Sequence, residues 1–333
     1  MRGLRVTIAA LIAVGAAAGS AGADGLPVGD VEVGPSGVTR SGEDVRYVAL
    51  RAGPNTLVAR VEQEGGRVLG TRLLSGRFTI PAVALDGSAA GLSADGRTLV
   101  LVRPRTGFPR KQTALAVLGT ARLRLRDTVT LAGDFSFDAL SPDGSLLYLV
   151  EYVDPLDPTR YVVRGYDVER GRLLPEPVVD PKIFGKVMRG YPVTRAASPD
   201  GRWAYTLYDG GGGHPFVHAL DTAERTAACI AVEALAGRAD LLDVRLAVAE
   251  GGGEVRVVAG AETVAVIDAV SLRLSEPSLP TPAPSALRDD GSTPWVLAVG
   301  LGALLLAGTA GLALVLRRRK RLVATQEGRP QGA

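Results

Sequence analysis

The chain has 333 residues, with 38 basic and 35 acidic side chains and a single cysteine. Once the charged segments at both ends are set aside, 30 basic and 34 acidic residues remain, so the middle of the chain carries a net charge near −4. This balance argues against nucleic acid as a partner, because it gives no concentrated positive surface. A single cysteine excludes an internal disulfide, so a domain of this size has to be held together by core burial.

Residues 1–23 have the layout of a cleavable secretory signal. Arg2 and Arg5 precede an apolar stretch over residues 6–14, and small residues follow as far as the Ala-Gly-Ala sequence at 21–23. This order of charged, apolar and small residues is typical of an export signal. We expect residues 1–23 to be removed. The alternative is an uncleaved second membrane span.

Residues 24–276 are predicted to be an extracytoplasmic domain built from a repeat. Three segments align without gaps, and each has a Ser-x-Asp-Gly turn that leads into a strand: SADGRTLVLV from Ser93, SPDGSLLYLV from Ser141 and SPDGRWAYTL from Ser198. Asp bonds its own backbone and Gly accepts positive φ, while the β-branched and aromatic residues that follow suit a strand. A second hairpin with an acidic turn follows, most clearly at Asp167 and Asp221.

The period of this repeat predicts the fold class. Weaker copies start at Ser41 and at a turn over residues 250–254, and the unit starts at Ser41, Ser93, Ser141 and Ser198 are 52, 48 and 57 residues apart. A propeller blade of four short strands takes about 40 to 50 residues. We therefore predict an all-β fold, a β-propeller of about five blades whose closed ring removes exposed sheet edges. An all-β sandwich is the alternative, but it would not explain a fixed period.

The Ser-Pro-Asp-Gly turn followed by a Tyr-bearing strand resembles the YVTN-type and TolB-like β-propeller repeats of exported bacterial proteins. The resemblance covers most of residues 40–275. It implies a propeller fold with a binding or scaffolding role and specifies no substrate. The segment from Tyr161 to Thr222 is also similar to membrane-anchored proteins of high-GC Gram-positive bacteria.

The C-terminal part predicts a stalk, one membrane span and a short tail. Residues 277–294 are rich in proline and polar residues, which is typical of an extended linker. Residues 295–316 are uncharged and, at roughly 1.5 Å per residue, reach about 33 Å, enough to cross a hydrocarbon core of about 30 Å. Five adjacent cations from Arg317 to Arg321 then mark the cytoplasmic side. We expect a single-pass protein of the cell membrane with its N-terminal domain outside and residues 317–333 in the cytoplasm.

Two further features belong to this anchor. The sequence LPTPA at residues 279–283 resembles a cell-wall sorting signal, but Pro282 stands where such a signal is cleaved after Thr, so a permanent anchor is favoured. Small residues at i, i+4 and i+8, namely Ala303, Ala307 and Gly311, lie on one face of the predicted span. This spacing lets two spans approach closely and predicts weak self-association.

Three loops leave the strands that follow the Ser-x-Asp-Gly turns, so they are expected on one face of the propeller: residues 103–113, 152–161 and 208–216. Aromatic and charged side chains on clustered loops of a rigid scaffold are typical of binding faces. The alternative is three ordinary solvated loops. The candidate binding residues are Phe108, Arg110, Lys111, Asp154, Asp157, Arg160, Tyr161, His214 and Phe216.

No catalytic residue, cofactor or metal site is predicted. The glycine run at residues 209–214 lacks the helix start and the Lys that a phosphate loop needs. His214 and His218 stand four apart on a predicted strand, about 13 Å from each other, too far to share a metal ion with Cys229. Cys229 is expected to be a small buried hydrophobe. The predicted function is a non-enzymatic binding or scaffolding module for a protein or cell-envelope ligand. The alternative is a propeller-fold hydrolase or lactonase anchored at the cell surface.

Overall fold

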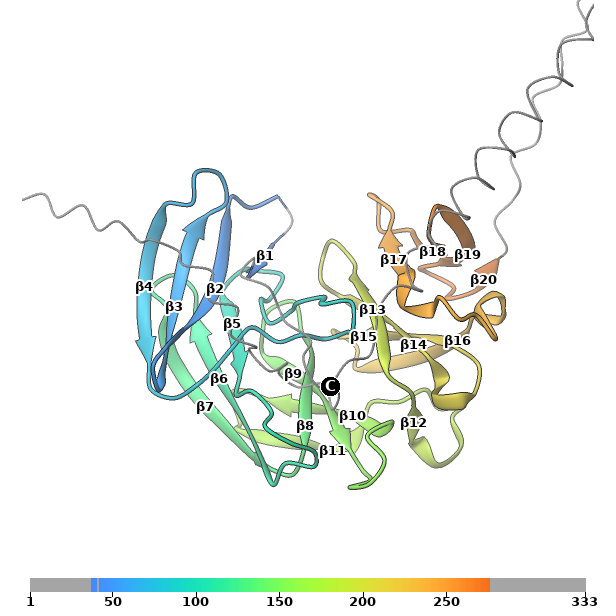
Figure 1. Ribbon diagram of the computed structural model, residues 1–333, viewed down its shortest axis with the longest axis horizontal. Coiled ribbons are helices and arrows are strands. Elements are labelled where there is room, and N and C mark those ends of the chain that lie inside the picture. The colour runs from blue at the N-terminus through green and yellow to red at the C-terminus, as the bar shows by residue number, and fades with distance from the viewer. Residues whose placement is uncertain (1–36, 41, 276–333) are drawn as a thin grey trace, which may run out of the picture. The chain divides into compact units, whose positions relative to one another are not determined.

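The computed structural model describes residues 37–40 and 42–275, which form five antiparallel sheets in chain order (Figure 1). The first sheet holds β1 (Val38–Thr39), β2 (Val45–Ala52), β3 (Asn55–Glu62) and β4 (Val68–Leu74). The second holds β5 (Thr98–Val102), β6 (Gln112–Gly119) and β7 (Arg124–Ala132). The third holds β8 (Phe135–Leu140), β9 (Leu146–Tyr152), β10 (Arg160–Asp167) and β11 (Arg172–Pro177), with β12 (Met188–Arg189) paired to β10.

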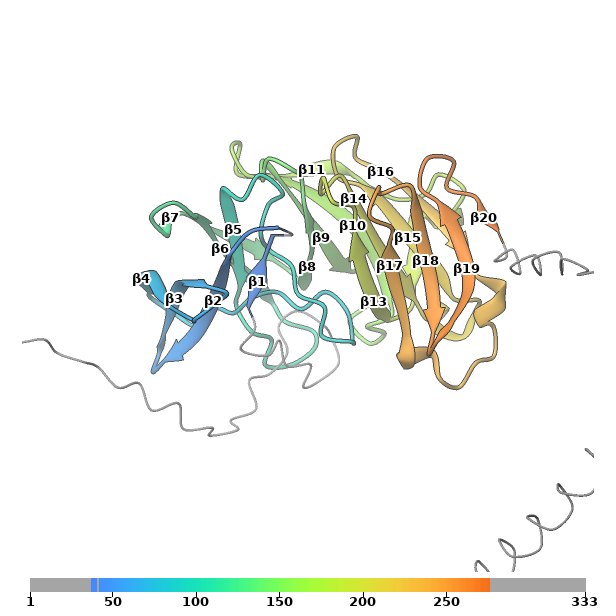
Figure 2. The same cartoon turned by 90° about the horizontal axis from the view of Figure 1, so that it is seen from above.

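The last two sheets repeat the same plan of neighbouring strands. The fourth holds β13 (Pro192–Ala197), β14 (Trp203–Tyr208), β15 (Phe216–Asp221) and β16 (Thr226–Ala231). The fifth holds β17 (Val244–Val248), β18 (Glu254–Ala259), β19 (Glu262–Asp268) and β20 (Leu274–Ser275). Figure 2 shows the sheets following one another as blades. The predicted all-β class is confirmed, and five separate sheets agree with the predicted number of blades rather than with a two-sheet sandwich.

The Ser-x-Asp-Gly turn has the same hydrogen bonds in three blades. In the third blade, Ser141 Oγ donates to Asp143 Oδ1 at 2.6 Å, Ser145 N donates to the same oxygen at 3.0 Å, and Leu146 N donates to Ser141 Oγ at 2.9 Å. The bond from Ser141 is the main reason that the pKa of Asp143 lies below its usual range. Gly144 has φ 71°, which only glycine adopts freely. The turns that begin at Ser93 and Ser198 repeat these bonds.

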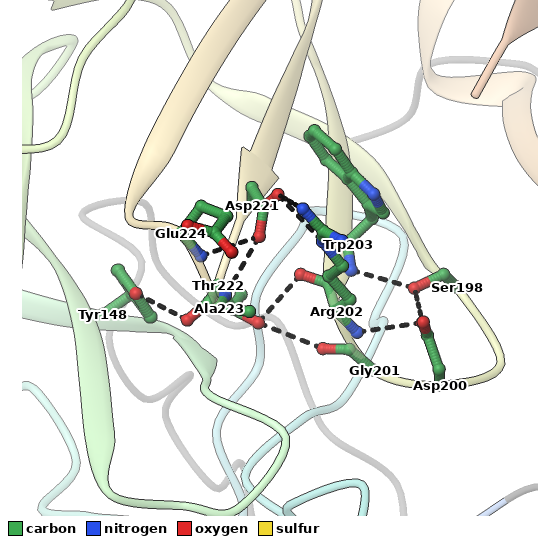
Figure 3. A network of polar contacts seen from close by, with 10 residues as sticks. All are labelled: Tyr148, Ser198, Asp200, Gly201, Arg202, Trp203, Asp221, Thr222, Ala223 and Glu224. Carbon is green, nitrogen blue, oxygen red and sulfur yellow. Dashed lines mark hydrogen bonds and ion pairs between the residues drawn. The ribbon is translucent and has the colours of Figure 1, made fainter. Parts of the chain in front are cut away.

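In the fourth blade a polar network connects this turn to the next hairpin and to the third blade (Figure 3). Asp221 Oδ2 accepts from Arg202 Nε at 2.9 Å and Nη2 at 2.6 Å. Thr222 Oγ1 donates to the carbonyl of Arg202 at 2.8 Å, and the Tyr148 hydroxyl donates to the carbonyl of Thr222 at 2.7 Å. The fourth blade is therefore closed on itself by local polar contacts and is also joined to the third blade through Tyr148.

Apolar cores lie between consecutive blades. Tyr47 and Val58 of the first blade pack with Leu99 and Leu101 of the second, and equivalent clusters join the second to the third, the third to the fourth and the fourth to the fifth blade. Within residues 37–40 and 42–275, no buried cluster joins the fifth blade to the first. Apolar cores therefore fill the junctions from the first blade through to the fifth. The described residues supply no such core between the fifth blade and the first.

The second blade departs from the repeat because its inner segment crosses the centre of the propeller. Isolated bridges such as Leu92 to Leu99 replace a regular inner strand. In the connection from β4 to β5, Leu85 N donates to the carbonyl of Pro192 at 2.9 Å and Asp86 N to that of Val193 at 3.1 Å. This connection therefore pairs with the inner strand of the fourth blade and joins blades that are not neighbours.

The predicted signal (1–23), stalk (277–294), span (295–316) and tail (317–333) lie outside the residues that the structure describes, as does Ser41. In the part of the chain that is described, no helix is long and apolar enough to cross a membrane. The helical elements there are 3-10 turns at Phe184–Lys186, Gly210–Gly212, Glu233–Leu235 and Leu241–Asp243.

Candidate functional site

Loops 103–111, 153–159 and 209–215 connect β5 to β6, β9 to β10 and β14 to β15. Each loop leaves the strand that follows a Ser-x-Asp-Gly turn, as predicted, so the three loops share one end of the propeller. The structure brings the first two together through aromatic contacts. The Phe108 ring packs edge-on against Tyr152, with 5.6 Å between ring centroids and an interplanar angle of 89°. The Arg105 guanidinium lies over both rings, 5.6 Å from the centroid of Phe108 and 5.1 Å from that of Tyr152. These contacts hold loop 103–111 on the third blade.

Arg110 turns inward rather than outward. Its Nε lies 3.3 Å from Oδ1 of Asp134, and its side chain is 10% exposed. The buried Asp134 carboxylate is also paired with Arg105 and accepts from Arg110 N at 2.8 Å. The prediction that Arg110 is displayed is therefore wrong, because a buried carboxylate holds both arginines in the interior. Lys111, the next residue, is exposed.

The charged residues of loop 153–159 and its flanks are paired with one another. Arg160 Nη1 lies 3.0 Å from Asp154 Oδ2, and Arg189 Nη2 lies 3.1 Å from Asp157 Oδ2. The pKa of Asp154 lies below its usual range mainly because of the hydrogen bond from Leu156 N. The pKa of Asp157 is lowered mainly by its bond with the Thr159 side chain. These pairs stiffen the loop and leave its charges largely compensated.

Tyr161 does not face outward. It belongs to β10, is 1% exposed, and stacks on Tyr208 at 5.1 Å between centroids. Tyr208 in turn stacks on the half-buried Phe216 at 5.4 Å. Burial raises the pKa of Tyr161 well above its usual value. The expectation that Tyr161 is displayed is wrong, because β10 places its ring in the core between the third and fourth blades. His214 is exposed, with Nδ1 2.7 Å from Glu233 Oε2.

The sequence prediction missed the most exposed apolar residues of this end. Leu156 is 91% exposed and Val153 is 44% exposed, and both belong to loop 153–159. Pro155 and Pro109 are exposed as well, and Phe108 is half-buried. We call these five residues the loop patch. One feature of the sequence could have revealed the loop patch: Leu156 stands between two Asp-Pro pairs. Asp and Pro are sufficient for a turn, so an apolar side chain there is not explained by the turn itself.

The opposite end, which carries the Ser-x-Asp-Gly turns, holds a cavity of ≈ 740 Å³ that all five blades line. Many of its lining residues are small, for example Ala89, Ala139, Ala196 and Ala249. The buried ion pair of Asp138 with Arg195 forms part of the lining. Among the described residues, no three His, Cys, Asp or Glu side chains converge to hold a metal ion. The mouth is therefore a wide cavity lined mostly by small residues, with the Asp138–Arg195 pair among them.

His218 and Cys229 lie directly opposite each other on β15 and β16. His218 is fully buried, and neither of its ring nitrogens has a hydrogen-bond partner. Burial lowers its pKa to about 4. Cys229 is only partly buried, with Sγ 3.9 Å from Met188 Sδ, and burial raises its thiol pKa to about 12. The expected strand through His218 is confirmed, while His214 lies in the preceding loop.

No family model and no curated protein matches the chain. Solved structures with a similar arrangement include hydrazine synthase of Kuenenia stuttgartiensis, at 16% identity and a TM-score of 0.42, covering 77% of this chain and 80% of that one. TolB from Acinetobacter baumannii is 14% identical with a TM-score of 0.34, covering 70% of this chain and 56% of that one. The β-propeller domain of Swd1 from Myceliophteria thermophila is 13% identical with a TM-score of 0.40, covering 72% of each. Similarity at this level carries no argument about function, and the propeller assignment depends on the sheets themselves.

Proposed function

We propose that this chain is a non-enzymatic β-propeller that binds or scaffolds a protein or cell-envelope ligand at the outer face of the cell membrane. The observation that carries the proposal is the loop patch, where Leu156 is 91% exposed on a loop fixed by ion pairs and turn hydrogen bonds. An apolar side chain held in water by a rigid loop and surrounded by charges is typical of an interaction site. Because the nearby carboxylates are already paired, the patch favours a partner with a complementary apolar surface.

The proposed site is narrower than the set of residues expected from the sequence. Phe108 stays in it, while Asp154, Asp157, Arg160 and Lys111 become its charged rim. Phe216 and His214, on the fourth blade, are candidates for the periphery of the contact. The alternative of a hydrolase or lactonase remains a second proposal, and no single observation at the mouth at the other end favours it over the loop patch.

A photo-crosslinking amino acid at position 156, introduced into the full chain in intact cells, is expected to capture the partner. The matched control is position 270, because Val270 is 90% exposed on a different blade and lies outside the loop patch. Adding Val153→Glu should reduce the adduct from position 156 roughly tenfold, as expected when a charge enters an apolar contact. The same adducts from positions 156 and 270, or an adduct unchanged by Val153→Glu, would contradict the proposal.

The proposed anchor is the predicted span at residues 295–316, with the propeller outside and residues 317–333 in the cytoplasm. Protease added to intact cells should then remove the propeller and spare a tag placed after Ala333. The control is the same treatment after the membrane has been permeabilised, which should remove the tag as well. Loss of the tag from intact cells would show that the orientation is wrong.

A further inference from the structure

The last hairpin of the second blade differs from those of the other blades at one position. In four blades the strand that leads into this hairpin ends on an acidic residue: Glu62 in β3, Asp167 in β10, Asp221 in β15 and Asp268 in β19. The equivalent strand of the second blade, β6, ends on Gly119. Register confirms the equivalence, because each of these residues lies opposite the first residue of the preceding strand, as Asp221 does with Trp203 and Gly119 with Thr98. The second blade therefore lacks a carboxylate that the other four have.

In the other blades this carboxylate has a partner close in the chain. It pairs with an arginine in three of them: Glu62 with Arg67 at 2.8 Å, Asp167 with Arg170 at 2.7 Å and Asp221 with Arg202 at 2.6 Å. Figure 3 shows the pair of the fourth blade, where Arg202 reaches from the Ser-x-Asp-Gly turn to the hairpin. In the fifth blade, Asp268 Oδ1 accepts from the hydroxyl of Ser271 at 2.7 Å. The position thus supplies negative charge or a turn cap wherever it is acidic.

Arg97 of the second blade is the counterpart of Arg202. Both residues directly follow the glycine of a Ser-x-Asp-Gly turn. The carbonyl of Arg97 accepts from Thr120 N at 3.1 Å, and the carbonyl of Arg202 accepts from Thr222 N at 2.8 Å. The backbone frame is therefore the same in the two blades, but Gly119 stands where Asp221 would face the arginine.

A second guanidinium lies where the carboxylate is missing. A Cβ added at Gly119 would be 2.8 Å from Arg126 Nε, so the side chain of Arg126 lies directly over this glycine. β7 has a bulge here with Arg126 as the extra residue, and a bulge re-aims a side chain. Arg126 Nη2 donates to the carbonyl of Arg97 at 3.4 Å. The second blade therefore has two arginines where the fourth blade has an arginine and an acid.

Four arginines line one pocket of ≈ 620 Å³ beside this hairpin: Arg97, Arg122, Arg124 and Arg126. All four are exposed, and none forms an ion pair within residues 37–40 and 42–275. Asp95 and Asp127, the acids nearest to them in the sequence, are not among the lining residues. The net charge near −4 of the middle of the chain does not show this local cluster. We call it the arginine pocket.

We propose that the arginine pocket binds a phosphate group, either free phosphate or the terminal phosphate of a small ester. Guanidinium N–H donors match the oxygens of a carboxylate or a phosphate. A carboxylate has two oxygens and one charge, which is sufficient for the single arginine that it pairs with in the other blades. Four arginines are better matched by a phosphate, which has up to about two charges and at least three acceptor oxygens. The bound anion takes the place of the carboxylate that the second blade lacks.

The site is separate from the loop patch. The hairpin after β6 is bonded to the Ser-x-Asp-Gly turn, since Thr120 Oγ1 donates to the carbonyl of Gly96 at 2.7 Å. Loop 103–111 leaves the other end of β5. A phosphate in the arginine pocket and a partner at the loop patch can therefore be bound at the same time.

The test is equilibrium dialysis of radiolabelled inorganic phosphate against the full chain in a neutral detergent, with chloride keeping the ionic strength constant. We expect saturable binding. Arg122→Gln and Arg124→Gln should each weaken it roughly tenfold, as expected for the loss of one charge-assisted hydrogen bond. The matched control is Arg170→Gln, which removes an exposed arginine from the equivalent hairpin of the third blade, where Asp167 is its partner. This control should leave the affinity near that of the parent.

Gly119→Asp tests the missing carboxylate directly. It gives the second blade the acid that the other blades have, and its charge should prevent phosphate binding. Gly119→Asn is the matched control, because it adds a side chain of the same size and displaces the Arg126 guanidinium in the same way without adding a charge. Its affinity for phosphate should stay at least roughly tenfold above that of Gly119→Asp. Urea unfolding without phosphate should show Gly119→Asp to be at least as stable as Gly119→Asn, which separates loss of the site from loss of the fold.

Competition identifies the source of the phosphate group. Displacement of the label by glycerol phosphate would support a terminal ester as the ligand, and a failure to displace it would support free phosphate. Acetate at the same concentration should not compete. The proposal would be overturned if phosphate binding did not saturate, if acetate competed as well as unlabelled phosphate, or if Gly119→Asp and Gly119→Asn lost the same affinity. It would also be overturned if Arg170→Gln weakened binding as much as Arg124→Gln.

Discussion

Lowering the pH from 7 to 4.5 is expected to destabilise the folded propeller by about 2 kcal/mol through His218 alone. An unfolded histidine titrates near pH 6.5, whereas burial lowers the pKa of His218 to about 4 in the folded chain. Between these two values the unfolded state binds a proton that the folded state does not. The stability is therefore fully present above about pH 6.5 and is lost as the pH falls towards 4.

This histidine effect is separable from the effect of the turn carboxylates. Hydrogen bonds lower the pKa values of Asp143 and Asp200 from 3.8, so their contribution is lost only as the pH falls further. Urea titrations at pH 7, 5.5 and 4.5 would measure how steeply the free energy of unfolding falls with pH. His218→Met should make this pH dependence flatter over the range, while His214→Gln, which changes the only other histidine, should leave it unchanged. A wild-type slope in His218→Met would contradict the assignment.

The features that the sequence predicted correctly depend on contacts close in the chain. Ser141, Asp143 and Gly144 make a turn with bonds that span a few residues, so residue type and spacing are sufficient to identify it. The blade order follows from repeating that turn. Asp221 occupies the acidic hairpin turn expected of it, where its Oδ1 accepts from the amides of Ala223 and Glu224, both at 3.0 Å.

The features that it missed depend on distant partners or on the side of a strand. Arg110 turns inward because of Asp134, 24 residues later, and no local pattern shows such a pair. Tyr161 was placed in a loop, but it pairs with Met188 of β12, and a residue inside a strand points to one fixed face. The connection from β4 to β5 was also missed, because Leu85 and Asp86 are held by the carbonyls of Pro192 and Val193, which lie more than a full repeat later in the chain.

Replacing Arg195 by Leu is expected to cost about 3 to 5 kcal/mol of stability, the range for breaking a buried ion pair from one side. Arg195 on β13 is paired with Asp138 on β8, and their side chains are 9% and 2% exposed. Arg195 Nη1 also donates to the carbonyl of Asp138 at 3.1 Å. Without the guanidinium, the buried Asp138 side chain would lose its ion-pair partner at the junction of the third and fourth blades. Urea unfolding of the full chain would measure the loss.

The pair can be distinguished from a simple packing effect by removing both charges. The double variant Asp138→Leu with Arg195→Leu should recover most of the stability, because apolar replacement of a buried ion pair is often close to neutral. The control is Arg238→Leu, which breaks an ion pair with Asp240 whose side chains are 32% and 48% exposed, and it should cost far less stability than Arg195→Leu because water screens exposed pairs. If Arg195→Leu cost no more than this control, the pair would not be fastening the two blades. If the double variant were as unstable as the single one, the loss would reflect packing around Arg195 rather than an uncompensated carboxylate.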